Sequence, residues 1–305
     1  MEDYIHEPMQ LISYALFYAV CRLLAFLPLR ALYVLSDFLY LIIRYVVGYR
    51  RKVILENLRN SFPEKTEQER VKIMGQFYHY MCDLFVEIIK ILHISDKEMH
   101  RRIYWHNPEI VKDWYKKGKN IYCVAGHYGN WEWAASIESS YLYIPLYHPL
   151  ENKYFDRFYY RLRTRFGTDP IASNMVVRAI NKYKSENRLT LLYFLADQAP
   201  LSNPANYWTT FLNQESSIFL GPEKLARKYN AAVAFAEVRR VKRGYYEIFM
   251  TPITENAAET AEHEITDRHV ELLEQAIRRA PQYWLWSHRR WKRKRILPPQ
   301  ENPAT

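Results

Sequence analysis

The chain has 305 residues, enough for one large domain or two modest ones, and 49% of them are hydrophobic, which permits a sizeable core. A net charge of +10 together with 16% aromatic residues suits an anionic partner: phospholipid headgroups, an acidic carrier protein or nucleic acid. The three cysteines, Cys21, Cys82 and Cys123, are odd in number and lie far apart in apolar segments, which argues against a disulfide framework and favours reduced thiols in a domain facing the cytosol.

The N-terminal 48 residues are predicted to associate with a membrane. Between residues 11 and 47 only Arg22, Arg30, Asp37 and Arg44 carry charge. The acidic start, without a small-residue cleavage site, argues against a cleavable signal peptide. We expect residues 11–27 to form an anchor helix and residues 31–47 an interfacial or partly covered helix, with the basic residues that follow on the cytosolic side. Two buried helices of a soluble protein are the alternative.

Alternating helix and strand patterns follow. Thr66 to Glu69 has the spacing of a capping box, and apolar residues then recur at helical intervals as far as Leu92. Arg243-Gly244 joins the last two strands as a hairpin. We predict an α/β fold with a mixed central sheet flanked by helices, a domain of residues 49–305 behind N-terminal helices 1–48. The predicted strands are residues 120–125, 141–147, 189–195, 231–238 and 245–250. One helix is predicted to begin at residue 131, and four further helices are predicted over residues 154–166, 174–185, 217–229 and 264–279.

The string from Gly126 to Glu132 directly follows an apolar strand and carries the strongest chemical signal. Its glycines, at 126 and 129, permit a sharp turn, and Asn130 can cap a helix that begins at Trp131. His127 in such a turn, with a carboxylate five positions later, can act as an oriented general base near neutral pH. Asp197 and Gln198 follow another strand, so both polar groups are expected at one edge of the sheet.

Each of these residues also has an ordinary structural explanation. A histidine after a strand is more often structural than catalytic, and a glutamate in the first helical turn is favoured by the helix dipole. A zinc site is less consistent, because the segment has one histidine where the metalloprotease helix has two. Arginines between 157 and 165 suit either a solvated helix face or phosphate recognition. The basic tail from His288 to Arg295 suits nucleic acid, a membrane or an acidic carrier.

Together these segments resemble the bacterial lipid A late acyltransferases, within the glycerolipid acyltransferases. The string around His127 is similar to their motif of a histidine followed, after four residues, by an acidic residue. The resemblance runs through essentially the whole chain. Its other segments, in the same order and spacing, are Asn57-Leu58, Ser61 to Glu64, Asn152 with Arg163 and Gly167, Asp197-Gln198, Phe219 to Gly221, and Ala280 to Trp291.

The resemblance implies an O-acyltransferase of lipopolysaccharide biosynthesis at the cytoplasmic face of the bacterial inner membrane. It moves a fatty acyl group from the thioester of acyl carrier protein to a hydroxyl of a lipid A precursor. His127 is then the general base, and Glu132 holds its tautomer and stabilises the imidazolium. Neither a metal nor another cofactor is expected, and nucleic acid is not expected as a partner. The residues expected to bind substrate are Gly129, Asn130, Asn152, Arg163, Asp197, Gln198, His288, Arg289 and Arg290.

Direct transfer is expected, because no cysteine or serine stands where the base can activate it. Backbone amides near the helix start and Arg163 are the expected donors to the oxyanion. Residues 209–213 depart from the family's phenylalanine-glycine element, which leaves open a different acceptor, an aminolipid or an aryl-polyene-type lipid. A basic membrane-associated binding protein without activity is the alternative from another class.

Overall fold

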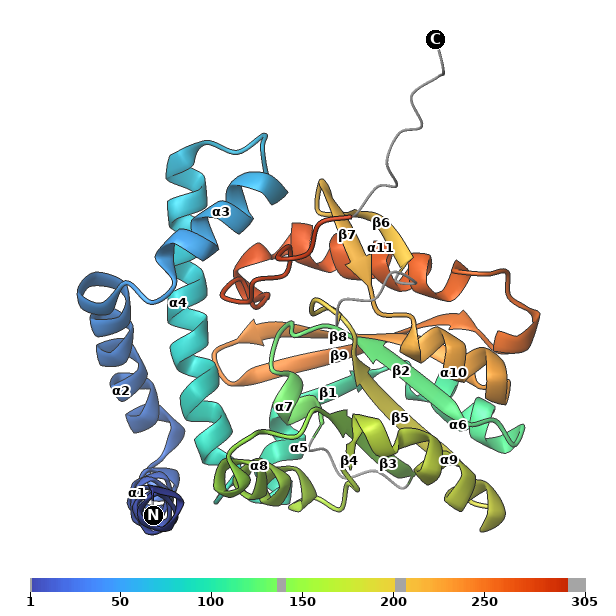
Figure 1. The fold of residues 1–305 in the computed structure, drawn as a ribbon, viewed down its shortest axis with the longest axis horizontal. Coiled ribbons are helices and arrows are strands. Elements are labelled where there is room, and N and C mark those ends of the chain that lie inside the picture. Colours follow the sequence, from blue (N-terminus) through green and yellow to red (C-terminus); the bar gives the residue numbers. More distant parts are fainter. Residues whose placement is uncertain (1, 136–140, 201–206, 296–305) are drawn as a thin grey trace.

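A seven-stranded mixed sheet forms the centre of the molecule (Figure 1). The structure, a computed structural model, describes residues 2–135, 141–200 and 207–295, with side chains from Gln10 onward. The antiparallel hairpin of β8 and β9 is built into an otherwise parallel sheet. In order across the sheet the strands are β1 (Ile103–His106), β9 (Tyr245–Thr254), β8 (Ala232–Lys242), β2 (Ile121–Ala125), β5 (Thr190–Leu195), β3 (Leu142–Tyr147) and β4 (Ile171–Ala172).

Helices cover both faces of the sheet, and the alternation of side chains along its central strands divides the core in two. Tyr122 and Val124 of β2 belong to the cluster packed by α9, α10 and α11, whereas Ile121 and Cys123 belong to the cluster packed by α6, α7 and α8. Because β2 is buried on both faces, it reads as a continuous apolar run. The bounds are α6 (Pro108–Lys116), α7 (Trp131–Ala134), α8 (Lys153–Thr164), α9 (Val176–Ser185), α10 (Gly221–Tyr229) and α11 (Glu264–Arg279).

The long helix α4 (Glu67–Lys90) joins the N-terminal helices to the sheet. Thr66 accepts from the backbone of Glu69 while the Glu69 carboxylate accepts from the backbone of Thr66, so the predicted capping box is confirmed. On one side α4 packs against α2 (Leu29–Leu41), and with its other residues it enters both core clusters. The remaining helices here are α1 (Glu2–Phe26), the π-helix η1 (Ile42–Val47), α3 (Arg51–Ser61) and α5 (Asp96–Arg102).

The predicted mixed sheet with flanking helices is confirmed, and two local predictions are corrected. Residues 217–220 do not begin a helix: Gln214–Ile218 is β7, which pairs with β6 (Tyr207–Phe211) in a separate hairpin, and α10 starts at Gly221. The helix expected over 31–47 is α-helical only to Leu41 and continues as the π-helix η1. In both places hydrophobic periodicity alone does not distinguish the alternatives, because each segment is short.

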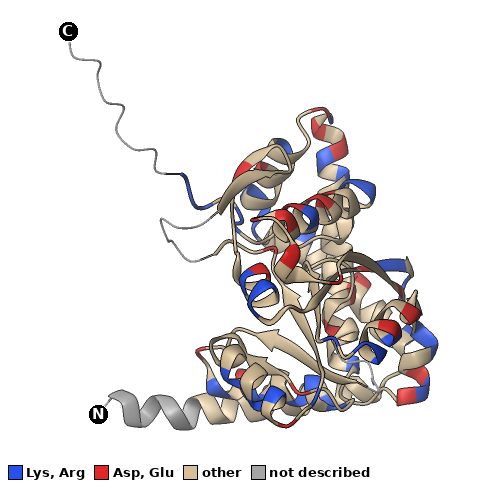
Figure 2. Ribbon diagram, turned by 90° about the vertical axis from the view of Figure 1, so that its right-hand side faces the viewer, with Lys and Arg blue, Asp and Glu red and all other residues tan. Residues whose placement is uncertain are grey.

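The N-terminal helices lie along one edge of the molecule and expose apolar side chains. Helix α1 is seen end-on in Figure 1 and lengthwise in Figure 2. None of the described helices is by itself long and apolar enough to cross a membrane, while α2–η1 and α3, bent by 92° from each other, meet that criterion together by length and composition. The large apolar residues exposed here include Leu11, Ile12, Leu16, Val20, Leu23, Phe26, Val34, Phe38, Leu41, Val46 and Val47.

Candidate active site

His127 lies in the tight connection between β2 and α7. Gly129 has a φ of +61°, and a Cβ at this position would stand 2.0 Å from the carbonyl oxygen of Val238, so only glycine fits. The side chain of Asn130 accepts a hydrogen bond from the backbone of Trp133 at 2.9 Å, which confirms the predicted cap. The turn therefore holds the histidine at the carboxyl end of the central strand.

A carboxylate from the neighbouring strand orients the His127 ring. Asp197 Oδ1 lies 2.7 Å from Nδ1 of His127, and Asp197 Oδ2 accepts from the His127 backbone at 2.9 Å. With a proton shared between Nδ1 and Asp197, Nε2 is the ring atom free to take a proton. The side-chain nitrogen of Gln198 lies 3.3 Å from that Nε2. The sheet thus brings together the two polar clusters predicted to meet, through β2 and β5, which pair in parallel.

Asp197 is held as a buried anion. Burial raises the pKa of its carboxyl, but the charge and hydrogen bonds of His127 and a hydrogen bond from Trp284 outweigh burial and lower the pKa below its ordinary value. The indole Nε1 of Trp284 donates to Asp197 Oδ2 at 2.8 Å. An ionised carboxylate at Nδ1 favours the imidazolium that forms when Nε2 accepts a proton.

Glu132 does not occupy the position expected for it. The Nδ1 partner of His127 is Asp197, whereas the Glu132 carboxylate accepts from Arg163 Nε at 3.0 Å and from Arg163 Nη2 at 2.6 Å. This bidentate pair is largely buried, and the charge of Glu132 raises the pKa of Arg163 against the opposing effect of burial. The expectation that Glu132 holds the tautomer of His127 is therefore corrected: the turn of α7 directs Glu132 toward α8, and the parallel strand delivers Asp197 instead.

Arg163 is one of the groups expected to donate a hydrogen bond to the oxyanion, and one of its nitrogens remains available for that. Its Nη1 has no hydrogen-bond partner among the described residues, while Nε and Nη2 are used by Glu132. The backbone amides of the turn are already occupied, since those of His127, Tyr128 and Gly129 donate to Asp197, Gly126 and Tyr283. These three amides are therefore not available to an oxyanion, which leaves Arg163 and the amides at the start of α7, the donors expected from the sequence.

The other expected binding residues have different surroundings. Asn152 caps α8 through hydrogen bonds from two backbone amides. Half-buried His288 lies near Asp197 and His127, and burial lowers its pKa to about 4. Arg290 is buried and donates to the carbonyl of Ser217 at 2.7 Å, so it braces β7, while Arg289 is exposed. Both His288 and Arg290 are affected by the charge of Asp197, so the tail reaches the surroundings of the histidine site at these two residues.

A buried glutamate that the sequence patterns did not single out supports the turn. Glu87 of α4 accepts from Asn130 at 2.7 Å, from Tyr246 at 2.6 Å and from Tyr33 at 2.8 Å. Its backbone carbonyl also accepts from the indole of Trp133. The available signal was an acidic residue within the apolar spacing of the long helix, a position at which an unpaired charge is costly. Glu87 therefore ties the turn to α4, α2 and β9.

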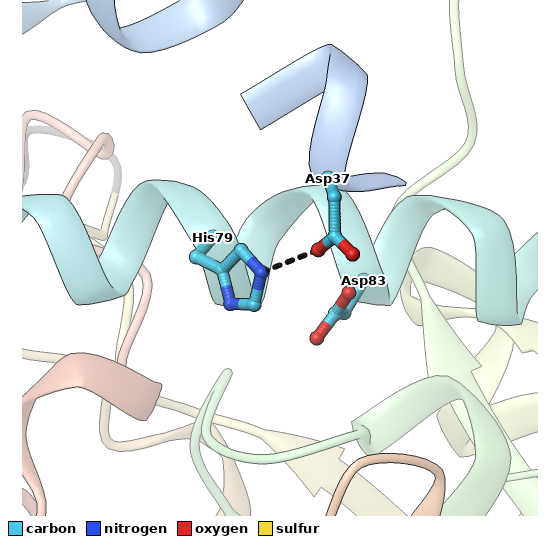
Figure 3. A group of neighbouring side chains, drawn as sticks. All are labelled: Asp37, His79 and Asp83. Carbon is cyan, nitrogen blue, oxygen red and sulfur yellow. Dashed lines mark hydrogen bonds and ion pairs between the residues drawn. The ribbon is translucent and has the colours of Figure 1, made fainter. Parts of the chain in front are cut away.

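One group of side chains has the composition of a metal site. Asp37, His79 and Asp83 place ligand atoms within 4.8 Å of one another, on α2 and α4 (Figure 3). Arg243 donates to both aspartates, at 2.6 Å to Asp37 and 2.5 Å to Asp83, and Arg240 donates to Asp83 at 2.6 Å. Because two arginines already neutralise the two carboxylates, this cluster is an ion-pair network that fastens α2 to α4 and the β8–β9 hairpin.

A histidine held by a buried aspartate at the end of a central parallel strand is typical of α/β enzymes that activate a hydroxyl or water. The family described as "Bacterial lipid A biosynthesis acyltransferase" matches residues 6–293. The chain belongs to this family, and it is an acyltransferase of lipid A synthesis.

Two curated relatives agree with this assignment. The chain is 23% identical over 271 residues to the lipid A biosynthesis acyltransferase of Haemophilus influenzae, covering 87% of this chain and 82% of the relative. It is 22% identical over 247 residues to the lipid A biosynthesis palmitoleoyltransferase of Escherichia coli, covering 80% and 79%. The alternative of a binding protein without activity is not supported.

Proposed function

We propose that this enzyme transfers a fatty acyl group from the thioester of acyl carrier protein to a hydroxyl of a lipid A precursor, with His127 as the general base. The observation that carries the proposal is the 2.7 Å contact between Asp197 and Nδ1 of His127, which leaves Nε2 to accept a proton. The base must be partly accessible, and the His127 side chain is 17% exposed. Asp197, rather than Glu132, holds the tautomer.

The reaction proceeds by direct attack. The acceptor hydroxyl oxygen bonds to the thioester carbonyl carbon while its proton passes to Nε2 of His127. The tetrahedral oxyanion is stabilised by Nη1 of Arg163, which Glu132 holds in place. Collapse breaks the carbon–sulfur bond, and the imidazolium returns the proton to the leaving thiolate. The products are an ester and a free thiol on the carrier. All three cysteines are buried, and burial raises the pKa of each thiol, which supports transfer without an acyl-enzyme.

Residues 1–48 are proposed to hold the enzyme at the cytoplasmic face of the bacterial inner membrane, with residues 49–305 as the acyltransferase domain. The exposed apolar side chains of α1, α2 and η1 support this placement, because they would otherwise face water. The net charge of +10 supports both an anionic membrane surface and acyl carrier protein, an acidic partner.

Acyl transfer by the purified protein tests the mechanism. With acyl carrier protein thioester and a lipid A precursor in detergent, His127→Ala is expected to lower kcat by about a hundredfold or more, the loss typical of deleting a general base. His93→Ala, on an exposed histidine outside the site, is the matched control. A His127→Ala enzyme that turns over at the wild-type rate would remove the base from the mechanism.

The acceptor has an alternative, an aminolipid or an aryl-polyene-type lipid, favoured by the departure at residues 209–213. These residues form the end of β6 and the tight turn into β7, in which Leu212 and Asn213 have positive φ. Lipid mass spectrometry of a deletion strain separates the two. Lipid A that lacks one acyl chain supports the proposed acceptor, and unaltered lipid A with a changed second lipid supports the alternative.

A further inference from the structure

A cationic cleft lies apart from the histidine site, between η1, α4 and η4 (Pro281–Tyr283). Its volume is about 620 Å³. None of His127, Glu132, Asp197 or Gln198 lines it, and among the described residues no carboxylate does. The residues that line it include Tyr40, Arg44, Lys72, Gly75, Arg240 and Tyr283.

Two of its cations have no anionic partner. Arg240 is balanced by the ion-pair network with Asp83, described above. Arg44 donates to the hydroxyl of Tyr40 and lies against the rings of Tyr40 and Tyr45, none of which neutralises its charge. Neither Arg44 nor exposed Lys72 pairs with a carboxylate in the part of the chain that the structure describes. The lining of the cleft therefore includes two positive charges, those of Arg44 and Lys72, that no described carboxylate neutralises.

The backbone makes room for this arrangement. A Cβ on Gly75 would come within 2.3 Å of the Arg44 guanidinium, so the glycine allows the arginine to lie across α4. Arg44 itself lies in the π-helix η1, a kind of irregular turn that recurs at functional sites. The position of the Arg44 guanidinium thus depends on the backbone of two elements, η1 and α4.

The neighbouring surface identifies the ligand. Val46 and Val47 of η1 are 80% and 62% exposed, and Leu41 and Phe38 of α2 are also exposed. Exposed apolar side chains on α2 and η1, the elements that supply Tyr40 and Arg44 to the cleft, match an amphiphile with an acyl region and a phosphate headgroup. We propose that this cleft binds the phosphate headgroup of an anionic phospholipid in the membrane surface and thereby sets the orientation of the enzyme on the bilayer. The proposal rests on the proposed membrane association.

Vesicle flotation tests it without any need for turnover. The wild-type chain is mixed with vesicles of phosphatidylcholine alone or with added phosphatidylglycerol. The Arg44→Gln/Lys72→Gln variant is expected to lose about tenfold or more in affinity for the anionic vesicles, since each lost cation near the surface weakens binding about fivefold. Lys112→Gln/Lys184→Gln removes the same charge from exposed residues of α6 and α9 and is expected to lose less than threefold.

Gly75→Ala provides a test that changes no charge. Alanine favours the helix, so α4 remains folded, but its methyl group displaces the Arg44 guanidinium. Its preference for anionic over neutral vesicles is expected to fall, with unchanged circular dichroism. An unaltered preference overturns the proposal, as does an equal loss in the Lys112/Lys184 control.

Two further outcomes distinguish failure of the cleft proposal from failure of the proposed membrane association, and a lipid headgroup from a free phosphate as the ligand. Wild-type binding to neutral and anionic vesicles alike overturns the cleft and leaves membrane association standing, whereas binding to neither overturns both. Inorganic phosphate is the competitor for the soluble source. Displacement from anionic vesicles by phosphate, with no effect of chloride at equal ionic strength, assigns the cleft to a free phosphate and overturns the lipid occupant.

Discussion

The orientation of His127 depends on a residue 70 positions away. Asp197 bonds both the ring and the backbone of the histidine, and Trp284 bonds Asp197 in turn. Three segments distant in the sequence thus determine which ring nitrogen is free to act. The strength of His127 as the proposed general base depends on that hydrogen-bond chain rather than on the histidine alone.

Asp197→Asn is expected to lower kcat by about a hundredfold or more while the protein stays folded. The amide is neutral and can accept from Trp284 but no longer stabilises the imidazolium, and its NH₂ group can turn toward Nδ1 and place the ring proton on Nε2. Steady-state acyl transfer with circular dichroism measures both properties. Asp267→Asn, an exposed aspartate bonded to Tyr207, is the control and should keep its rate. A fully active Asp197→Asn enzyme would contradict the assignment.

The Glu132–Arg163 pair is predicted to contribute to stability as well as to positioning. Glu132→Gln leaves the Arg163 guanidinium buried without its counter-charge, and the expected cost is about 3 kcal/mol in the free energy of unfolding. Arg163→Met should cost a similar amount, and the double variant should lose clearly less than the sum of the two.

A double-mutant cycle by chemical denaturation measures this coupling. The exposed pair Arg268–Glu271 on α11, with side chains 44% and 53% exposed, is the comparison and should couple by less than about 1 kcal/mol. If Glu132→Gln keeps wild-type stability but loses activity, Glu132 serves the chemistry in a way that its pairing with Arg163 does not explain.

At the scale of elements, the connection from β2 to α7 keeps its shape because several other elements contact Gly129. The carbonyl of Val238 on β8 lies against Gly129, whose own backbone bonds Tyr283 and the Tyr80 hydroxyl of α4. The turn is therefore held from three sides, and its shape is imposed by packing as much as by local sequence.

Gly129→Ala should destabilise the protein by about 3 kcal/mol or more, because the left-handed backbone costs an alanine about 1–2 kcal/mol and the methyl group also displaces a backbone carbonyl. Gly118→Ala isolates the first contribution, since Gly118 has a φ of +72° but no atom within 4 Å of its added Cβ. Thermal unfolding of both variants gives the comparison. Equal shifts in Tm would mean that the Val238 contact carries no energy.

Across the whole molecule, helix α4 joins α1 and α2, which expose apolar side chains, to the turn that carries His127. Lys90 at the end of α4 donates to the carbonyls of Ala25 and Leu27, at the junction of α1 and α2. Glu87, one helical turn earlier, bonds both Tyr33 of α2 and Asn130 of the turn. Helix α4 thus fixes the distance between the proposed membrane-contacting surface and the site.

Leu16→Glu/Leu23→Glu should lower partitioning into neutral vesicles by about a hundredfold or more. The reason is that each leucine side chain buried in the bilayer contributes about 1.5–3 kcal/mol to membrane binding. These side chains are 67% and 70% exposed, so the fold should be unaffected. Met175→Glu/Val177→Glu places the same charges near α9, at the opposite side of Figure 1, and should leave partitioning unchanged. If both double variants lose partitioning equally, the loss comes from the added negative charge, and α1 is not the membrane-contacting surface.

The sequence by itself determined most elements of this protein and the segment from which the general base is proposed. The periodicity of residues 67–90, the apolar run before His127 and the glycines after it are local patterns, and local patterns are sufficient for a helix, a strand and a turn. Gln214–Ile218 and Ile103–His106 were too short or too polar to be distinguished in this way.

Only the tertiary structure decided how those residues pair. Five residues along the chain, Glu132 was the nearest carboxylate to His127, but the partner that bonds Nδ1 is Asp197. The reason is the parallel register that sets Ala125 beside Leu195, so that each strand delivers the residue two positions later to the same place. Strand pairing is a long-range interaction that leaves no periodic pattern in either segment. The contacts of Glu87 with Asn130 and of Arg44 with Gly75 are also long-range and leave no such pattern.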